Sequence, residues 1–429
     1  MPLLKAIIGY STYTMKSVTS IISNLLFRHF RIDAQYFFSG AVWLTIIQAI
    51  TVSGALIVSV VLANVLDESQ YGMYRYILGL GILLSTFSLT GIGQSIFQTS
   101  AKKHLWFYQR GIRASLIYSL GIGISGLIGS VYYFIQDSHE LALGCLLIAL
   151  FQPFVNTFQL IFSSLQGERK FRDSTLLQGL KTVFITATTV GTVYITQDVF
   201  WLVFSFLVSN TAINLVIHIL YKPHDTLTFD EKIYSRYMTY AQNTSIRNIL
   251  GNIAFRIDSI IVFQQLGATN LAIYTIATIL PEQIKTSFKN ISTLLVPKYA
   301  MHDNLDSIKK SMFSRSIQLL LFTILITILY IVFAPLIYTL LFPKYHEAII
   351  LTQLISLSFP AMIALIPLSA LQAHTEEKKL NKLNTYTSML MIVLTTVLTI
   401  THGLMGAIFA KILSRYINVA FTYFYLWQK

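Results

Sequence analysis

The sequence predicts an all-α membrane protein that crosses the bilayer about twelve times. Of its 429 residues, 54% are hydrophobic and only 11% are charged, and the mean hydropathy is +0.63. A soluble domain carries about 25% charged residues. The apolar residues are gathered into runs that are long enough to cross the hydrocarbon core as a helix, which takes about 20 residues. The alternating strands of about 10 residues that build a membrane β-barrel are absent from the sequence.

The expected spans follow one another with short connections. They are placed at 38–66, 76–98, 114–135, 141–165, 174–196, 199–221, 237–265, 271–296, 313–342, 348–371, 385–401 and 403–427. On one side the connections are small turns, several of them acidic, such as LDESQ and QDSHE. On the other side they are longer and basic, such as TSAKKHLWFYQRGIR. Because basic loops stay in the cytoplasm, we expect both termini there and the short turns outside.

The formal net charge of +13 follows from this topology. The Lys and Arg residues outside the spans are concentrated in the N-terminal tail and the longer loops, where they face anionic lipid headgroups. Membrane lipids are therefore expected partners, and nucleic acid is not.

The first 37 residues precede the first span. Within them, Val18, Ile21, Ile22 and Leu25 recur at helical spacing. We expect residues 1–37 to form an amphipathic cytoplasmic segment that lies on the membrane surface, with a frayed tail as the alternative. The opening MPLLKAIIGYSTYTMKS has no small-residue cleavage site and is not expected to be a signal peptide.

A weak internal repeat divides the chain into two halves. Shifted by 200 residues, SVVLANVLDESQYGMY (Ser59–Tyr74) lies over SIIVFQQLGATNLAIY (Ser259–Tyr274), and each copy contains the turn between two spans. Internal repeats are typical of transporters. We therefore expect two pseudo-symmetric six-helix bundles, at 38–221 and 237–429, joined by a cytoplasmic linker at 222–236.

Motifs for catalysis, for nucleotides and for metals are missing from the sequence. The one cysteine, Cys145, lies in an apolar run and is expected in the core. GIGISG matches GxGxxG but lies inside a span, where small residues allow close helix packing. There is no GxxxxGK[ST] phosphate loop, and no two of the nine histidines are four residues apart. We expect no enzymatic activity, no metal site and no cofactor, apart from possible coupling to H⁺ or Na⁺.

Several charged residues fall inside the expected spans, where a charge costs at least ~2.5–3.5 kcal/mol at the bilayer centre. The polar residues of the eighth and twelfth spans each gather on one helical face, as do several of the seventh, which suits a water-filled lumen. The candidates for the lining of such a cavity are Arg247, Lys285, Lys289, Lys411, Arg415, Gln48 and Asn418. Lys181 and Arg315 lie nearer to cytoplasmic ends and are expected to snorkel to the surface.

Two acidic residues, Asp258 and Glu282, are candidates for ion coupling, because a carboxylate in such a setting can titrate. Arg256 and Arg75 are candidates for a gate. Arg256 and Asp258 are two residues apart, hence about 200° around the helix, so each needs its own partner. Glu282 can instead form an internal ion pair with a nearby lysine.

Two segments carry a family resemblance. LANVLDESQYGMYRYILGLGILLSTFSLTGIGQSI resembles the first hairpin of polysaccharide-exporting flippases, in which an LG-x-x-x-x-G-x-Y turn precedes a helix and Gly-Ile-Gly. FRIDSIIVFQQLGATNLAIY resembles their seventh-to-eighth hairpin. The similarity covers about 38–428 and is to the O-antigen (Wzx-type) branch of the multidrug/oligosaccharidyl-lipid/polysaccharide (MOP) exporter superfamily. The chain departs from the pattern at Asp67 and Ala272, where glycine is usual or frequent.

The resemblance implies a V-shaped pair of bundles, like that of the multidrug (MATE) exporters, in a bacterial cytoplasmic (inner) membrane. It implies that alternating access carries an undecaprenyl-pyrophosphate-linked oligosaccharide, an O-antigen or capsule repeat unit, to the outer leaflet. The resemblance further implies that the cavity residues named above bind the pyrophosphate and sugars of this cargo. The partners that it implies are the lipid-linked oligosaccharide and a polysaccharide polymerase or chain-length machinery. The alternatives are another MOP-type exporter, such as a drug/cation antiporter or a lipid II-type flippase, and a membrane-embedded polymerase or glycosyltransferase.

Overall fold

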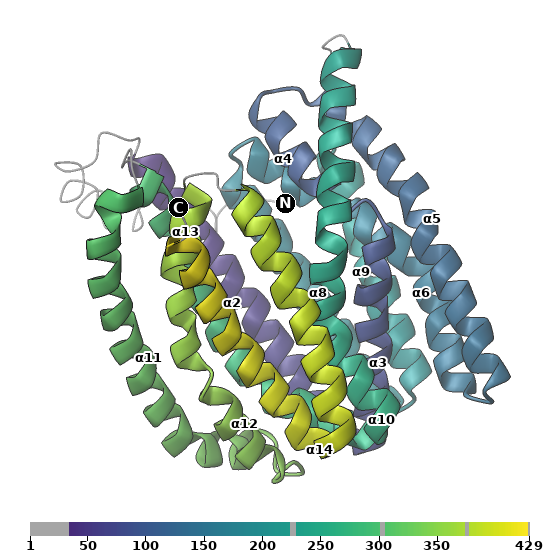
Figure 1. The fold of residues 1–429 in the computed structure, drawn as a ribbon. Helices are drawn as coiled ribbons and strands as arrows, with labels where there is room; N and C mark the ends of the chain where they lie inside the picture. Colours follow the sequence, from purple (N-terminus) through teal and green to yellow (C-terminus); the bar gives the residue numbers. More distant parts are fainter. Residues whose placement is uncertain (1–33, 224–228, 301–304, 374–376, 428–429) are drawn as a thin grey trace, which may run out of the picture.

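The computed structural model describes residues 34–223, 229–300, 305–373 and 377–427 (Figure 1), and these ranges are helical apart from turns and short connections. Most of the predicted amphipathic segment at 1–37 lies outside them. The N-terminal half contains α2 (Ala34–Val65), α3 (Glu68–Leu84), η1 (Ser85–Phe87), α4 (Ile92–Ala101), α5 (Trp106–Ile135), α6 (His139–Phe158), α7 (Ile161–Gly167), α8 (Phe171–Ile195) and α9 (Val199–Tyr221). The C-terminal half contains α10 (Glu231–Ala300), α11 (Leu305–Leu341), α12 (Ala348–Ser356), η2 (Phe359–Ala364), α13 (Leu365–Ala373) and α14 (Glu377–Trp427).

Within the described ranges, eight helices are long and apolar enough to cross a membrane, or nine if the bent pair formed by α3–η1 and α4 is counted as one span. Two of the eight, α10 and α14, each fold back at a glycine: Gly267 has φ 85° and Gly403 has φ 58°. Only glycine adopts such backbone angles at little cost. The helices agree with about twelve spans when the bent pair counts as one, each leg of α10 and α14 counts separately, and the less apolar α8 is added. The prediction of an all-α polytopic protein is confirmed.

Two spans are broken within their length. α3–η1 and α4 meet at a bend of 65° around Thr90 and Gly91. The span at 348–373 is divided into α12, η2 and α13, with Pro360 near the start of η2. Because proline has no backbone N–H to donate, it starts a new helical segment rather than continuing the old one. This second break places the side chain of Ser358 at the candidate site.

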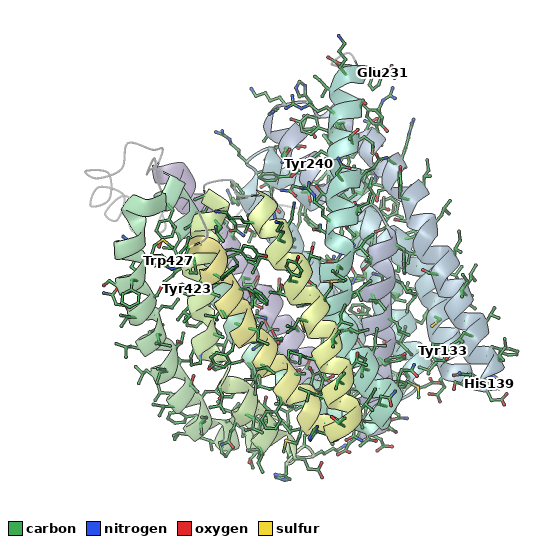
Figure 2. The ribbon with its side chains drawn as sticks, in the orientation of Figure 1. Tyr133, His139, Glu231, Tyr240, Tyr423 and Trp427 are labelled. Atoms are coloured by element: carbon green, nitrogen blue, oxygen red, sulfur yellow. The ribbon has the colours of Figure 1, made fainter. Side chains whose placement is uncertain are left out.

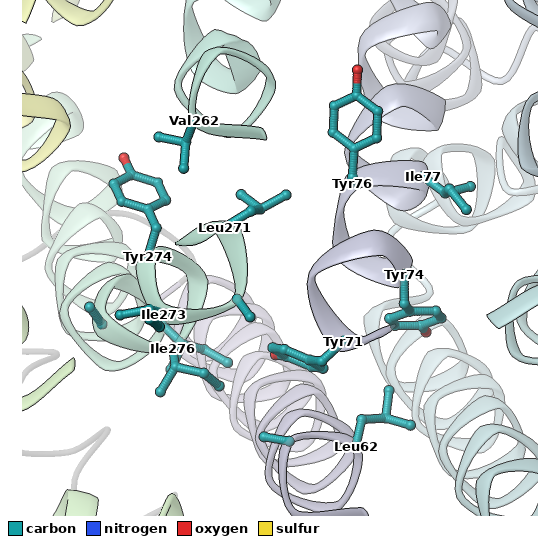
Figure 3. Packing of buried hydrophobic residues seen from close by; sticks show 14 of the residues in the cluster. Leu62, Tyr71, Tyr74, Tyr76, Ile77, Val262, Leu271, Ile273, Tyr274 and Ile276 are labelled. Carbon is teal, nitrogen blue, oxygen red and sulfur yellow. The ribbon is translucent and has the colours of Figure 1, made fainter. Parts of the chain in front are cut away.

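The end of the molecule with the short turns is closed by one core that both halves share. Figure 3 shows tyrosines of α3 beside apolar residues of α10. The rings of Tyr71 and Tyr345 meet edge-on, with their centroids 6.3 Å apart. Gly72 lies so close to α10 that a Cβ there would stand 1.9 Å from the carbonyl oxygen of Ala268. Glycine at position 72 is what lets the two hairpins touch.

Two hydrogen bonds also join the halves at this end. The Asn64 side-chain amide donates to the carbonyl of Leu341 (2.9 Å), and the Lys344 ammonium donates to the carbonyl of Leu66 (3.2 Å). Both acceptors lie where a helix stops, so their carbonyls lack a partner in their own helix. These bonds fix the end of α2 to the end of α11.

At the opposite end the core is divided in two. One cluster packs the first leg of α10 against α4, α5, α7 and α9, whereas the other packs its second leg against α11, α13 and α14. The first leg is also tied to the N-terminal half, because Gly91 N–H donates to Ser245 Oγ (2.8 Å) and Ser95 Oγ–H donates to the Tyr237 carbonyl (2.9 Å). A shared core at one end and separate cores at the other make the V-shaped arrangement of two bundles.

Labelled side chains in Figure 2 mark the two ends of the molecule. Tyr133 and His139 lie near the short-turn end, whereas Glu231 lies at the far tip of α10 and Trp427 near the last turn of α14. α9 ends at Tyr221 and α10 begins at Glu231, within the predicted linker region. The domain boundaries at 38–221, 222–236 and 237–429 stay a prediction.

Candidate functional site

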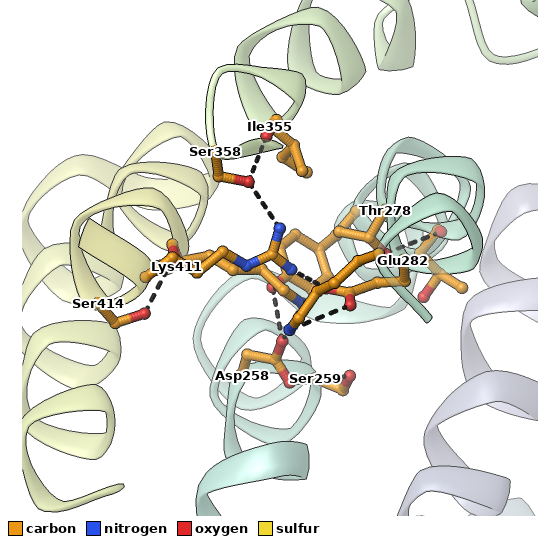
Figure 4. Close-up of polar contacts among 12 residues, drawn as sticks. Asp258, Ser259, Thr278, Glu282, Ile355, Ser358, Lys411 and Ser414 are labelled. Atoms are coloured by element: carbon orange, nitrogen blue, oxygen red, sulfur yellow. Dashed lines mark hydrogen bonds and ion pairs between the residues drawn. The ribbon is translucent and has the colours of Figure 1, made fainter. Parts of the chain in front are cut away.

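Five of the predicted site residues meet between α10 and α14 (Figure 4). They are Asp258 from the first leg of α10, Glu282 and Lys285 from its second leg, and Lys411 and Arg415 from the second leg of α14. We call these five residues the charged cluster. They come from three helical segments that are adjacent because α10 and α14 fold back at Gly267 and Gly403.

The charged cluster lies near the middle of the expected membrane. Asp258 is nine residues before the turn at Gly267, and Lys411 is eight residues after the turn at Gly403. At 1.5 Å of rise per residue, both lie about 12–14 Å along the helix axis from the short-turn end. The hydrocarbon core of a bilayer is about 30 Å thick, so neither side chain can reach water at a helix end.

Asp258 is only 3% exposed, and both of its carboxylate oxygens accept hydrogen bonds. Oδ2 accepts from the Tyr274 hydroxyl (2.7 Å) and from Lys411 Nζ (2.8 Å). Oδ1 accepts from the backbone N–H of Ser259 (2.7 Å). A buried carboxylate needs both a counter-charge and hydrogen bonds to offset its lost hydration, and Asp258 has both.

Lys411 is the centre of the cluster. Its ammonium lies 2.8 Å from Asp258 Oδ2, 3.2 Å from Glu282 Oε1 and 3.3 Å from the Tyr274 hydroxyl oxygen. An ammonium group has three N–H donors and accepts nothing, so three oxygens around it satisfy it completely. Lys411 therefore links the two legs of α10 through one charge.

Arg415 lies one turn further along α14 and joins Glu282 to the broken span. Its Nη2 donates to Glu282 Oε1, and its Nη1 donates to Ser358 Oγ (2.6 Å). Ser358 donates in turn to the Ile355 carbonyl (2.6 Å) at the end of α12. The planar guanidinium presents its donors as a fixed fork, which allows one side chain to hold two partners in different directions.

The charges of this cluster nearly cancel. Asp258 and Glu282 are balanced by Lys411 and Arg415, whose side chains are 12% and 11% exposed. Lys285 is the surplus cation. Its ammonium is 3.6 Å from Glu282 Oε2, and its side chain is 45% exposed. The cluster thus combines a self-neutralised interior with one positive group that is open to a ligand.

Three of the other predicted cavity residues, Arg247, Asn418 and Gln48, make no described contact with this cluster. Arg247 is exposed and eleven residues before Asp258, about 16 Å along the same helix, where it donates to the Asn243 carbonyl (3.3 Å). Asn418 is exposed, one turn beyond Arg415. Gln48 is half-buried on α2, in the N-terminal half. Lys289 lies on α10, but its side chain is outside the described residues.

The two predicted gate arginines make no ion pair with the charged cluster among the described residues, although Arg256 is near enough to interact electrostatically with Asp258, Glu282 and Arg75. Arg256 has its guanidinium carbon 4.9 Å from the ring centroid of Phe255, and its buried Nε lacks a hydrogen-bond partner among the described residues. Arg75 is half-buried on α3. Asp258 joins the cluster, whereas the guanidinium of Arg256 lies against the ring of its neighbour in sequence, Phe255.

Two members of the site were not among the predicted site residues. Tyr274 follows the turn at Gly267 by seven residues, and Asp258 precedes it by nine, so a tight hairpin brings them to similar depth. The position of the glycine relative to both residues was the available signal. Ser358 precedes Phe-Pro in the middle of an apolar run, and that proline was the sign of a broken span. Among the described residues, no group of three His, Cys, Asp or Glu side chains is placed to hold a metal ion.

A model of one protein family matches this chain over residues 61–350, which include both hairpins and three members of the charged cluster. The family is described as polysaccharide biosynthesis protein. The chain belongs to this family. No curated protein matches the sequence of this polysaccharide biosynthesis protein.

Solved structures with the same fold come from the MOP superfamily. The lipid II flippase MurJ, in an inward closed conformation, superposes with a TM-score of 0.69 at 13% identity, covering 90% of this chain and 87% of that chain. An outward-facing MATE multidrug resistance transporter gives 0.60 at 13% identity, covering 92% and 96%. A MOP superfamily transporter from Pyrococcus furiosus gives 0.61 at 11% identity, covering 91% and 95%.

At these identities the likeness shows the fold alone. Together with its apolar helices, it makes this polysaccharide biosynthesis protein a multi-pass membrane protein with the fold of MOP superfamily transporters and of the lipid II flippase. The resemblance noted in the sequence is thereby confirmed for the polysaccharide biosynthesis family and for the fold of the MOP exporters.

Proposed function

We propose that this protein flips an undecaprenyl-pyrophosphate-linked oligosaccharide, an O-antigen or capsule repeat unit, from the cytoplasmic to the outer leaflet of a bacterial inner membrane. The observation that carries the proposal is the half-exposed Lys285 beside a neutralised ion-pair network in mid-membrane. In a family tied to polysaccharide biosynthesis, an open cation at that depth suits an anionic lipid-linked cargo. The protein moves the cargo without breaking or forming a covalent bond.

The physical task of such a flippase is to replace water around a pyrophosphate and its sugars. These groups cannot cross hydrocarbon unaided, because their charges and hydroxyls would lose their hydration. Lys285 supplies the first attraction to the pyrophosphate. The prenyl tail is itself apolar and stays in the lipid while the headgroup crosses through the protein.

The ion pairs of the cluster offer a route to coupling. A pyrophosphate that approaches Lys285 competes with Glu282 and Asp258 for Arg415 and Lys411. Each cation that turns to the cargo leaves a carboxylate free to take up a proton or Na⁺. Because linkage is reciprocal, bound ion and bound cargo then favour each other. This makes Asp258 and Glu282 the coupling residues and Lys411 and Arg415 shared ligands.

Alternating access requires the closed end to open. With both termini in the cytoplasm, the short-turn end faces outward, and the contacts that close it are the Tyr71–Tyr345 ring pair and the Asn64–Leu341 and Lys344–Leu66 bonds. The structure then corresponds to a state that is closed to the outside. Release of cargo breaks these contacts and brings the separate cores of the other end together.

The test is a deletion of the gene in its native host, with lipid-linked oligosaccharide and surface polysaccharide measured together. We expect the lipid-linked unit to accumulate and the surface polymer to be lost, and wild-type protein to restore both. Lys285→Ala at normal protein level should restore export poorly, whereas Lys232→Ala, an exposed cation at the start of α10, should restore it fully. Normal surface polysaccharide in the deletion strain contradicts the proposal, and drug sensitivity in that strain would favour an antiporter.

A further inference from the structure

A cavity with polar groups in its wall lies inside the N-terminal half and includes none of the residues of the charged cluster. Its volume is about 340 Å³, and α3, η1, α6, α8 and α9 contribute to its wall. Small-molecule sites usually measure about 300–1,000 Å³ and combine apolar walls with a few convergent polar groups. The polar lining consists of Ser85, Gln152, Asn156, Gln159, Lys181 and Asn210. No Asp or Glu is among the residues that line it.

Lys181 is the one charge in this lining. It was expected to snorkel to the cytoplasmic surface, but it lines the internal cavity instead, ten residues after the start of α8 at Phe171. That is about 15 Å along the helix axis. Its ammonium lies 5.7 Å from the ring centroid of Phe162, and the described residues provide no ion pair for it. A cation–π contact offsets only part of the cost of burying a charge.

The amide of Asn156 presents its N–H groups to the cavity. The Ser85 hydroxyl uses its proton on the Gly81 carbonyl (2.8 Å), so it must accept the bond from Gln152 Nε2 (3.3 Å). The same Gln152 nitrogen donates to Asn156 Oδ1 (3.2 Å). With its oxygen engaged, Asn156 has its Nδ2 donors left for a ligand.

Asn210 is oriented in the same way from the other side. Asn214 Nδ2 donates to the Val155 carbonyl (3.4 Å), which only accepts, and the same nitrogen donates to Asn210 Oδ1 (3.4 Å). Asn210 is therefore also held by its oxygen, with its Nδ2 donors free for a ligand. One ammonium and two oriented amides make a cavity that offers positive charge and hydrogen-bond donors.

We propose that this cavity of the N-terminal half binds a sugar residue that carries an anionic group, such as the carboxylate of a uronic acid. Lys181 takes the carboxylate, Asn156 and Asn210 donate to carboxylate or hydroxyl oxygens, and Phe206 in the apolar wall packs on the C–H face of the ring. The volume suits one sugar ring. The proposal rests on the proposed function for the source of the sugar, which is a residue of the lipid-linked cargo rather than a free sugar acid.

Binding of a probe sugar tests the cavity independently of transport. Thermal unfolding of the purified full chain is measured with sodium D-glucuronate, with D-glucose and with inorganic phosphate at equal ionic strength. A ligand that binds only the native state raises Tm. We expect glucuronate to raise it through Lys181, glucose to have little effect, and any response to phosphate to be independent of Lys181. Lys181→Met should lower the apparent affinity for glucuronate about tenfold or more, because it removes a charge-assisted hydrogen bond.

Asn210→Asp is the second variant, because it keeps the oxygen that Asn214 bonds and replaces the free donors by a negative charge. It should abolish the response to glucuronate, whereas Lys232→Met, at an exposed cation near the start of α10, should leave that response unchanged. The same response in Lys181→Met as in wild type overturns the proposal. A phosphate response that equals that of glucuronate and is also lost in Lys181→Met overturns the sugar assignment and leaves a plain anion site.

Export in the native host separates this inference from the proposed function. Suppose that the deletion strain loses surface polysaccharide and Lys181→Met fully restores the export of an acidic polymer. The cavity then does not bind the cargo, so this inference is wrong while the proposed function stands. If glucuronate binds through Lys181 but the deletion strain exports normally, the proposed function fails, and the ligand is a free sugar acid. Loss of export in Lys181→Met at normal protein level supports both.

Discussion

The two halves of the molecule bury their cations in different ways. In the C-terminal half, Lys411 lies 2.8 Å from Asp258 and 3.2 Å from Glu282, which also accepts from Arg415. In the N-terminal half, Lys181 lines a cavity of amides and apolar groups that contains no carboxylate. Both environments impose a cost on an unpaired charge. In the C-terminal half the protein's own carboxylates neutralise the buried lysine, whereas in the N-terminal half the lysine has its positive charge available for a ligand. Removing the lysine should therefore destabilise the first site and not the second.

The largest expected effect is that of Lys411→Met. Asp258 is 3% exposed and would lose its counter-charge while its two other partners remain. Removing one member of a buried ion pair costs about 3–5 kcal/mol in the free energy of unfolding. Thermal unfolding of the purified protein, followed by tryptophan fluorescence, measures the loss.

The matched control is the double variant Lys411→Met with Asp258→Asn. It removes both charges and keeps an amide that still bonds Tyr274, so it should recover most of the lost stability. If the single variant is as stable as wild type, or the double variant is no better than the single, the cluster is not held together by this ion pair.

Arg415→Lys should have the next largest effect. The guanidinium reaches Glu282 with Nη2 and Ser358 with Nη1, whereas a lysine has one nitrogen and cannot hold both. Losing one hydrogen bond of a charged group costs about 1.5–3 kcal/mol. Asn418→Ala, one turn along the same helix and exposed, is the control and should change the free energy of unfolding by less than about 0.5 kcal/mol. Equal stability of both variants would mean that Arg415 does not hold the broken span.

Lys181→Met should not lower the free energy of unfolding, in contrast to Lys411→Met. It is the same substitution as Lys411→Met, but it removes an ammonium that has no carboxylate partner among the described residues. Relief of the buried charge, less a cation–π contact worth about 0.5–1 kcal/mol, should leave the free energy of unfolding unchanged or raise it by about 1 kcal/mol. Thermal unfolding without added sugar measures this. A loss as large as that of Lys411→Met would show that a partner for Lys181 exists and that the two halves do not differ.

The fold was predictable because the information for it is local. The predicted span 199–221 coincides with α9, and 348–371 nearly coincides with the region from α12 to α13. Apolar runs of span length state where a helix crosses the membrane, independently of its neighbours. Where a helix continues past the apolar run the prediction was short: α10 begins at Glu231, before the expected start at 237. Its polar first turns carry no hydropathy signal.

The site was only partly predictable because it depends on which helices meet. Helical faces correctly grouped Glu282 with Lys285, and Lys411 with Arg415. They also grouped Arg247 with Asp258, which share a face but lie about 16 Å apart along it. The helical face of a residue gives the direction of its side chain but not its depth in the membrane. Depth comes from the turns at Gly267 and Gly403, and the pairing of Asp258 with Lys411 additionally requires α14 to pack on α10.

Lys285→Met should have the smallest effect on stability and a large one on transport. Lys285 is neither paired in the interior like Lys411 nor enclosed in a cavity like Lys181. Its side chain is 45% exposed, and its carboxylate partner among the described residues, Glu282, is 3.6 Å away. Solvent-exposed ion pairs contribute about 0–1 kcal/mol, so the free energy of unfolding should fall by less than that. Export of surface polysaccharide should fall severalfold at unchanged protein level, because the cation that is open to the cargo is gone.

Lys285→Arg separates charge from packing in this last comparison. It keeps the positive charge at nearly the same length, so export should be largely retained while Lys285→Met loses it. If both variants lose export equally, the shape of Lys285 matters rather than its charge, and the pyrophosphate must be bound elsewhere. If Lys285→Met destabilises the protein as much as Lys411→Met, Lys285 is a structural member of the ion-pair network. Its ammonium is then not available to a ligand in the way proposed for Lys181.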